Sequence, residues 1–424
     1  MDFNLLRNKH PEFIYESFEY ELNAKALKIK FHFHLSPNVD FFPTIEIPVP
    51  DNLENIDNFV FNLGLTEMIS YWKAACSPKI VVRPGSLNNE QITFWKDLFI
   101  NGLGEFFYIN KVDFNDPSLL SIEVAANKKL ERSKKNNLTG DLILVGGGKD
   151  SAVTAELLAK DHALLLNPTL AAVNIARTAG FKNIILVKRT IAPTLLQLNE
   201  QGYLNGHTPF SAYLAFLSAT VAYIYKLKNI VVSNEQSAGE ANLEYLGLKV
   251  NHQYSKSMEF EKVFRKYLGK YLSSDLNYFS FLRPLNELQI AALFMQTEKY
   301  DNIFNSCNIG KGASWCGECA KCAFVYLLFS ALMPKERVKK IFGERNFFDN
   351  EKIKQYVKDL TGSGKHKPLD CVGTEEESRT ALNLITNPRD QEILAKIKND
   401  WVNEHFLPEE YGEILKMKMG ILKL

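Results

Sequence analysis

The sequence predicts an α/β protein built on a doubly wound parallel sheet, with an N-terminal α+β domain and a C-terminal helical region. Three observations lead to this prediction. The 424 residues are 46% hydrophobic and 23% charged, a balance typical of a folded chain with two or three domains. Near the N-terminus, polar and apolar residues alternate as in antiparallel strands. From residue 141, short apolar runs alternate with helix-like segments, as in a parallel sheet covered on both faces.

The first predicted domain spans residues 1–135. The alternating segments KALKIKFHFHL and TIEIPVP predict strands, KIVVRPG predicts a further strand, and NEQITFWKDLFINGL predicts a helix. The basic segment 127–137 is typical of a solvated linker, so we expect a domain boundary there.

The second predicted domain spans residues 136–330. LILV, HALLLN, NIILVKR and NIVVSN predict buried strands, and TPFSAYLAFLSATVAYIYKLK predicts a helix that is apolar on most of its surface. Asn167 is the expected N-cap of the helix PTLAAVNIARTAG, Pro168 lies in its first turn and Gly180 ends it. From residue 331 to 424, charged patterns such as KERVKKIFG and EKIKQYVKDL predict a smaller helical region.

The charge of the chain bears on its partners. A formal net charge of +1 gives no overall attraction to nucleic acid or to an anionic membrane surface. The N-terminus lacks the apolar core of a signal peptide, and no run of about 18 apolar residues occurs. We therefore expect a cytoplasmic protein that binds neither nucleic acid nor membrane; the sequence does not indicate an oligomeric state.

A glycine-rich segment, GGGKDS, follows the strand LILV and precedes a helix-like run. The N-terminus of a helix offers unpaired N–H groups and a partial positive charge, and glycines let an anion approach the backbone closely. Two common phosphate motifs fail here, because Asp150 follows Lys149 and because no third glycine has the required offset. A plain turn is the alternative, but we expect a phosphate-binding loop made of Gly146, Gly147, Gly148, Lys149, Asp150 and Ser151.

Four cysteines have the spacing C-x8-C-x2-C-x2-C: Cys307, Cys316, Cys319 and Cys322. Two thiolates two residues apart can bind one tetrahedral ion, and four sulfur ligands without histidine fit a closed structural Zn²⁺ site. An iron–sulfur cluster and four unpaired core cysteines are the alternatives.

Residues 147–151 resemble the pyrophosphate loop (S-G-G-x-D-S) of the N-type ATP pyrophosphatases, with Gly146 in the place of the serine. This resemblance implies a doubly wound sheet that binds ATP and cleaves it to AMP and pyrophosphate, with Asp150 helping to hold Mg²⁺. The cysteine spacing is similar to that of the preQ0 synthases, but those chains have a single domain and are much shorter.

A succession of segments between residues 140 and 380 resembles the ATP-dependent UDP-N-acetylmuramoyl-L-alanyl-L-glutamate epimerases (MurL). The segments are GGGKDSAVTAELL, NGHTPFSAYLAF, SNEQSAGEANL, VNHQYSKSMEFE, FLRPLNELQIAALF, CGECAKCAFVYLLFSAL and KPLDCVGTEEES. The resemblance implies that the chain converts the terminal L-Glu of UDP-MurNAc-L-Ala-L-Glu to D-Glu through an acyl-adenylate, in peptidoglycan precursor synthesis.

The resemblance also directs attention to titratable side chains. The candidates for proton transfer are Lys256, then His252 and His207, while Lys149 and Asp150 act on the phosphates. Tyr254 and Arg283 are candidates for substrate binding, and Asp370 and Cys371 form a second proposal. A structural role is the alternative for each of these residues.

Two other functions remain open at this point. One is a tRNA-modifying or preQ0-synthase-like enzyme that adenylates another substrate, which for tRNA would need a basic groove. The other is a non-catalytic module that binds a nucleotide.

Overall fold

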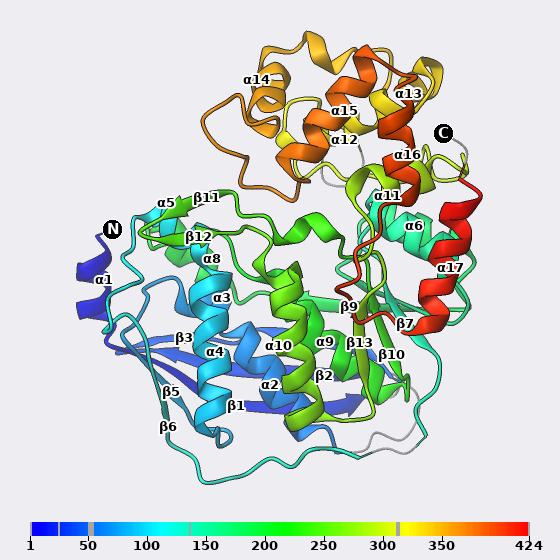
Figure 1. Cartoon of the computed structure of the whole chain (residues 1–424). Coiled ribbons are helices and arrows are strands. Elements are labelled where there is room, and N and C mark those ends of the chain that lie inside the picture. The colour runs from blue at the N-terminus through cyan, green and yellow to red at the C-terminus, as the bar shows by residue number, and fades with distance from the viewer. Residues whose placement is uncertain (1, 24–25, 50–54, 135–136, 311–313, 423–424) are drawn as a thin grey trace. The chain divides into compact units, whose positions relative to one another are not determined.

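The computed structural model describes residues 2–23, 26–49, 55–134, 137–310 and 314–422. The chain is an α/β protein with a helical C-terminal part (Figure 1). It divides into two units that alternate along the sequence: Met1–Gly140, Ile185–Ile230 and Glu244–Asn277 form the first, and Asp141–Ile184, Val231–Leu243 and Tyr278–Leu424 form the second. This division differs from the three contiguous domains expected from sequence, and the expected boundary at residues 135 and 136 lies outside the described residues.

The first unit contains a mixed sheet. Its strands are β1 (Glu12–Asn23), β2 (Ala26–Leu35), β3 (Val39–Phe41), β4 (Thr44–Pro48), β5 (Lys79–Val82) and β6 (Ser121–Val124). β2 pairs antiparallel with β1, β3 and β4, which confirms the antiparallel strands predicted from the alternating pattern. β5 pairs in parallel with β1 and β6. β9 (Asn183–Thr190), much later in the sequence, pairs antiparallel with β4 through its last residues.

The helices of the first unit are α1 (Phe3–Lys9), α2 (Asp57–Glu67), α3 (Ile69–Trp72), α4 (Asn89–Gly102), α5 (Gly104–Asn110), α8 (Pro193–Glu200), α9 (Phe210–Ile224) and α10 (Met258–Tyr267). As predicted, α9 is buried on most of its surface, and it packs against α2. The guanidinium of Arg189 on β9 donates two hydrogen bonds to the carboxylate of Glu67 on α2, at 2.8 and 3.0 Å. This fully buried carboxylate is thereby paired.

The second unit contains strands β7 (Asp141–Leu144), β8 (His162–Leu166), β10 (Asn229–Val232) and β13 (Asn277–Ser280). With the start of β9 they follow the order β9–β8–β7–β10–β13, and β7 and β8 pair in parallel. The chain leaves the central strand β7 in one direction and returns to its other side, which is the order of the predicted doubly wound sheet. A short hairpin of β11 (Leu243–Tyr245) and β12 (Leu248–Val250) is separate from this order.

The helices of the second unit include the predicted C-terminal group. They are α6 (Lys149–Leu158), α7 (Leu170–Ala179), α11 (Glu287–Phe294), α12 (Ala320–Leu332), α13 (Lys335–Phe342), α14 (Glu351–Leu360), α15 (Glu375–Thr386), α16 (Gln391–Asn399) and α17 (Glu409–Gly420). The apolar helix α12 packs against α11, α13, α14 and α15, and these helices gather together in Figure 1. Among the described residues, no helix is long and apolar enough to cross a membrane.

The start of α7 corrects one prediction. Thr169, and not Asn167, is the N-cap, because its hydroxyl accepts the N–H of Ala172 at 3.2 Å. Asn167 has a φ of 41°, so it belongs to the turn that precedes the helix. Gly180 ends α7 in the left-handed conformation (φ 87°), as predicted.

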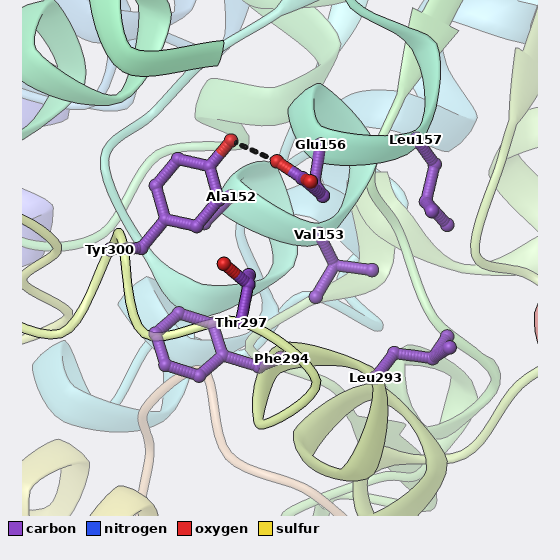
Figure 2. Close-up of a pocket in the computed structure, with 8 residues that line it drawn as sticks. All are labelled: Ala152, Val153, Glu156, Leu157, Leu293, Phe294, Thr297 and Tyr300. Carbon is purple, nitrogen blue, oxygen red and sulfur yellow. Dashed lines mark hydrogen bonds between the residues drawn. The ribbon is translucent and has the colours of Figure 1, made fainter. Parts of the chain in front are cut away.

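Helix α6, which follows the glycine loop, is fixed from one side by α11 and the segment after it. Figure 2 shows Ala152 and Val153 of α6 near Leu293 and Phe294 of α11. The hydroxyl of Tyr300 donates to the carboxylate of Glu156 at 2.6 Å. The apolar contacts and this hydrogen bond hold α6, and with it the loop, in a defined position.

Candidate functional site

The glycine loop runs from the end of β7 into α6, in the second unit. Gly147 has a φ of 98°, and a Cβ added there would lie 2.9 Å from the backbone nitrogen of Ala172, so only glycine fits. A Cβ at Gly146 would meet nothing within 4 Å. The position thus has room for the serine that the pyrophosphate-loop pattern carries there. Gly148 is the N-cap of α6 and makes no side-chain cap, so the first N–H groups of the helix are not capped by it.

Hydrogen bonds within the second unit close this loop. The hydroxyl of Ser151 accepts the N–H of Gly147 at 3.1 Å and donates to the carbonyl of Gly148 at 3.0 Å. The N–H of Asn305 donates to the carbonyl of Gly147 at 2.9 Å. The loop therefore has a fixed backbone, which is the preorganisation that a phosphate site requires.

Lys149 carries the positive charge of the loop, and its side chain is only 3% exposed. Its ammonium donates to the carboxylates of Asp150 and Glu287. Burial alone would lower the pKa of Lys149, but the two carboxylates outweigh burial and raise this pKa above its usual value. A phosphate that displaced one of the carboxylates would meet a charged ammonium.

Glu287 is a site residue that sequence reasoning missed. Burial raises the pKa of Glu287 above its usual value; the charge of Lys149 opposes the increase, and the carboxylates of Asp150, Glu235 and Glu377 add to it. In the sequence, Glu287 directly follows the N-cap Asn286 of α11, where an acidic residue is common for its interaction with the helix dipole. This position therefore gave no signal of contact with the loop.

A cavity of about 370 Å³ adjoins the glycine loop. Its lining includes Leu170 and Ala171 at the start of α7, together with Asn305, Trp315 and Arg345. Asn305 belongs to both features, since its N–H bonds to the loop while the residue lines the cavity. An aromatic ring, an amide and a guanidinium are groups that could contact a nucleoside beside the glycine loop.

The four predicted cysteines come together in the second unit. The sulfur of Cys307 lies 3.9 Å from that of Cys319, the sulfurs of Cys316 and Cys322 are 3.7 Å apart, and all four lie within 4.8 Å of one another. A tetrahedral ion with bonds of about 2.3 Å separates its sulfur ligands by about 3.8 Å. The arrangement therefore fits one tetrahedral metal ion.

Backbone N–H groups support these sulfurs. Gly310 donates to Cys307, Glu318 to Cys316 and Cys322 to Cys319, at 3.2 to 3.4 Å. Such hydrogen bonds stabilise thiolates, the form in which cysteine binds a metal. Cys319 also serves as the N-cap of α12, so the same sulfur starts a core helix. In addition, the N–H of Cys307 donates to the side chain of Asn305 at 2.6 Å, which links the cluster to the glycine loop.

The predicted candidates His207 and His252 lie together in the first unit. Their ring centroids are 4.3 Å apart, and both face Glu105, in the first turn of α5. Nδ1 of His252 donates to the Glu105 carboxylate, and Nδ1 of His207 lies 3.8 Å from it. We name these three residues the imidazole cluster; Glu105 had no sequence signal because it is far from both histidines in the chain.

Burial and charge set the protonation of the imidazole cluster. Burial lowers the pKa of His207 to about 4, and the positive charges of His252, Lys73 and Lys256 lower it further against the opposing charge of Glu105. Burial also lowers the pKa of Lys73 to about 8, with a contribution from Arg189. His207 is therefore a neutral imidazole near pH 7.

The other predicted residues have defined contacts. The ammonium of Lys256 donates to the side chain of Gln253 at 3.3 Å. The hydroxyl of Tyr254 donates to Asp97 at 2.5 Å, and burial, with that carboxylate, raises the pKa of Tyr254. Arg283 is 2% exposed and donates to the carbonyl of Glu235 at 2.6 Å.

Asp370 and Cys371 lie in the loop before α15. The carboxylate of Asp370 accepts from Asn308 at 2.8 Å, and the carbonyl of Cys371 accepts from the ammonium of Lys321. Both contacts are with segments next to the cysteine cluster, so the loop is attached to that part of the second unit.

Comparison with known proteins gives consistent matches over most of the chain. Residues 5–281 match the MurL N-terminal domain and residues 300–408 match the MurL C-terminal domain. A protein of a Micromonospora species is 36% identical over 75% of this chain and 72% of its own length. Proteins of Xanthomonas oryzae pv. oryzae and Salinispora tropica are each 33% identical over 81% of this chain and 77% and 78% of their own lengths.

All three relatives carry the name UDP-N-acetyl-alpha-D-muramoyl-L-alanyl-L-glutamate epimerase. No solved structure matches the chain. The two domain matches and the three relatives confirm the resemblance found in the sequence: this chain belongs to the MurL family of epimerases.

Proposed function

We propose that this chain converts the terminal L-Glu of UDP-MurNAc-L-Ala-L-Glu to D-Glu, with ATP consumed through an acyl-adenylate and AMP and pyrophosphate released. The substrate follows from the names of the relatives. The observation that carries the ATP chemistry is the loop of Gly147 and Gly148 before α6, with the charged Lys149 and Asp150 at the start of that helix.

The use of ATP has a chemical reason. Removing the α-proton beside a free carboxylate would place a second negative charge on the same group, which is very unfavourable. Adenylation cancels the charge of the carboxylate and makes its carbonyl an electron acceptor, so an ordinary side-chain base can then take the proton. Hydrolysis of the adenylate afterwards returns the carboxylate and releases AMP.

In this proposal the loop binds the β- and γ-phosphates. The N–H groups of Gly148 and of the first turn of α6 donate to phosphate oxygens, while the N–H of Gly147 stays bonded to Ser151 and keeps the loop closed. Lys149 turns from its carboxylate partners to the phosphates, where its charge stabilises the leaving pyrophosphate. Asp150 provides the carboxylate oxygen that suits Mg²⁺, and the bound ion would neutralise charge on the phosphates. The nucleoside occupies the adjoining cavity.

The four cysteines hold a structural Zn²⁺ in this proposal. With four sulfurs in tetrahedral spacing, the ion has no open position for a substrate, so its contribution is to the fold. Through Cys319 it fixes the start of α12, and through Asn305 it supports the carbonyl of Gly147.

Lys256, His252 and His207 remain our predicted proton carriers, and Tyr254 and Arg283 our predicted substrate contacts. Arg283, which donates to the backbone of Glu235, would pair with the side-chain carboxylate of the substrate or with a phosphate. Tyr254, whose hydroxyl donates to Asp97, would contact the substrate. Asp370 and Cys371 remain a second proposal.

The test is to incubate the protein with ATP, Mg²⁺ and UDP-MurNAc-L-Ala-L-Glu in D₂O, and to follow AMP release, α-deuteration and the chirality of the glutamate. AMP together with deuterated D-Glu is the expected result. AMP without exchange would leave an adenylating enzyme with a different substrate, such as a tRNA base. Exchange without AMP would exclude the acyl-adenylate.

A further inference from the structure

We infer that His252 is the side chain that removes the α-proton of the activated glutamate, and that Glu105 is the positioning residue that fixes and supports this imidazole. This inference rests on the proposed function and deepens it, because it selects one carrier among the three predicted and adds a residue that no sequence pattern indicated.

The first support is the hydrogen bond between His252 and Glu105. A carboxylate can only accept, so Nδ1 of His252 must carry the hydrogen that it donates to Glu105. The lone pair of the neutral ring then lies on Nε2. The negative charge of Glu105 also favours the imidazolium that forms when Nε2 takes a proton. The ring therefore has the tautomer that a general base needs.

The second support is the spacing of the two rings. If two bases act on opposite faces of one carbon, the nitrogen of each base lies about 3 Å from that carbon. The two nitrogens are then about 6 Å apart, with the substrate between them. The ring centroids of His207 and His252 are only 4.3 Å apart, so no substrate carbon fits between them. The two imidazoles must serve the same face, and only one of them needs to be the base.

The third support is the difference between the two imidazoles. His207 lies 3.8 Å from Glu105, beyond a hydrogen bond, and it stays neutral because of burial and of the positive charges around it. The positive charge of a protonated His252 is itself one of the causes of this lowered pKa. The imidazole cluster therefore accepts a single proton, and the ring bonded to Glu105 is the one that stabilises it.

The surrounding charges fit an anionic intermediate. Besides Glu105, the charged and titratable groups that act on His207 are His252, Lys73 and Lys256, and both lysines are cations when protonated. The positive charge of protonated Lys73 and Lys256 is favourable for an enolate. Two imidazoles and a carboxylate are also a reasonable ligand set for a divalent ion, which these two cations disfavour.

Nε2 of His252 forms a bond to the α-hydrogen, and the electron pair of the C–H bond moves into the activated carbonyl to give the enolate. The opposite face of the α-carbon then takes a proton derived from water, which gives the D configuration. The proton on His252 is lost to solvent, and the ring returns to its neutral tautomer.

The experiment compares His252→Gln with wild type in two assays: pyrophosphate release, which reports adenylation, and α-deuteration in D₂O, which reports proton removal. We expect deuteration to fall by about 10²–10⁴-fold, while pyrophosphate release in the first turnover stays close to that of wild type. His252→Gly should regain deuteration when imidazole is added to the solution. The matched control is His34→Gln, because His34 also bonds to a carboxylate, Asp40 at 2.9 Å, in the same unit.

Glu105 is tested by its effect on pH dependence. In Glu105→Gln we expect a loss of about 10–100-fold and an acid limb of the deuteration profile at lower pH, because an imidazole without a neighbouring carboxylate gives up its proton more readily. Glu105→Asp should restore the position of the limb. If Glu105 had only a structural role, its substitution would lower the amount of active protein but leave the acid limb of the deuteration profile at the same pH.

Several outcomes would overturn the inference: unchanged deuteration in His252→Gln, a loss of pyrophosphate release in that variant to the same extent as deuteration, or no response of His252→Gly to imidazole. The proposed function fails in a different way. A wild-type protein that exchanges the α-hydrogen without releasing pyrophosphate would exclude adenylation, while the assignment of His252 would still be decided by its variants.

Discussion

The glycine loop and the imidazole cluster are built in different ways. The loop is one run of consecutive residues, and its geometry comes from backbone conformation: a positive φ at Gly147 and a helix that begins at Lys149. The cluster takes one residue from each of three distant segments, and only the fold of the first unit brings Glu105, His207 and His252 together. Consecutive sites can be recognised in a sequence, whereas assembled sites become visible only in a structure.

The largest expected effect tests the loop. Asp150→Ala should reduce AMP formation by at least about 10²–10³-fold, because the variant loses the carboxylate that we propose to hold Mg²⁺ on the phosphates. The fold should survive, since Glu287 still pairs with the buried Lys149. AMP release and circular dichroism check the two statements. Asp161→Ala, in the connection between α6 and β8, is the control. An active Asp150→Ala protein would show that the loop is only a turn.

The next effect tests the cysteine cluster, a second site that is nearly consecutive. Cys319→Ser should lose the bound metal and lower the Tm by about 10 °C or more, because metal binding is coupled to folding and this sulfur also caps α12. Metal content by mass spectrometry and thermal unfolding measure both. Cys371→Ser should keep the metal, and a stable, metal-free Cys319→Ser protein would contradict a structural ion.

A smaller effect, on the free energy of unfolding, distinguishes the neighbouring Gly146 and Gly147. Gly147→Ala should destabilise the protein by about 1–2 kcal/mol from its positive φ alone, and more if the contact with the backbone of Ala172 does not relax. Gly146→Ser should change the free energy of unfolding by no more than about 0.5 kcal/mol, because the space there is open. Denaturant unfolding compares the two variants, and equal costs would mean that backbone geometry does not distinguish these positions.

A last effect, which appears only at acid pH, concerns the imidazole cluster. Folding holds His207 neutral down to about pH 4, whereas the unfolded chain protonates this residue near pH 6.5. As the pH falls, His207 is therefore protonated in the unfolded chain before it is protonated in the folded protein. The free energy of unfolding is unaffected above pH 6.5 and decreases by at most about 3 kcal/mol as the pH falls towards 4. In His207→Gln, the decline of the unfolding free energy between pH 6.5 and 4 should be shallower. An unchanged slope would mean that His207 titrates alike in both states.

The sequence predicted the strands β7, β8, β9 and β10, the glycine loop and the four cysteines, because period and spacing are local properties of the chain. It failed at Glu287 and Glu105 for a shared reason. Each lies in the first turn of a helix, where an acidic residue has an ordinary explanation in the helix dipole. The contacts of Glu287 with Lys149 and of Glu105 with His252 depend on tertiary packing, which no spacing rule encodes.

The N-cap of α7 failed for a different reason. Asn167, Pro168 and Thr169 are all compatible with a helix start, and the choice of Thr169 depends on the left-handed turn at Asn167. Asn167 and Thr169 have similar capping ability, and the conformation of the turn before the helix makes Thr169 the N-cap.

The alternation of the two units along the chain has a consequence for synthesis in the cell. β4 leaves the ribosome long before β9, its partner, and the first unit is complete only when Asn277 has emerged. Translation proceeds at about 5–20 residues per second, so the edge of β4 has unpaired backbone groups for many seconds before β9 is synthesised. A nascent chain released at Gly140 would therefore lack the strand that covers β4, and we expect it to be recognised by chaperones or degraded.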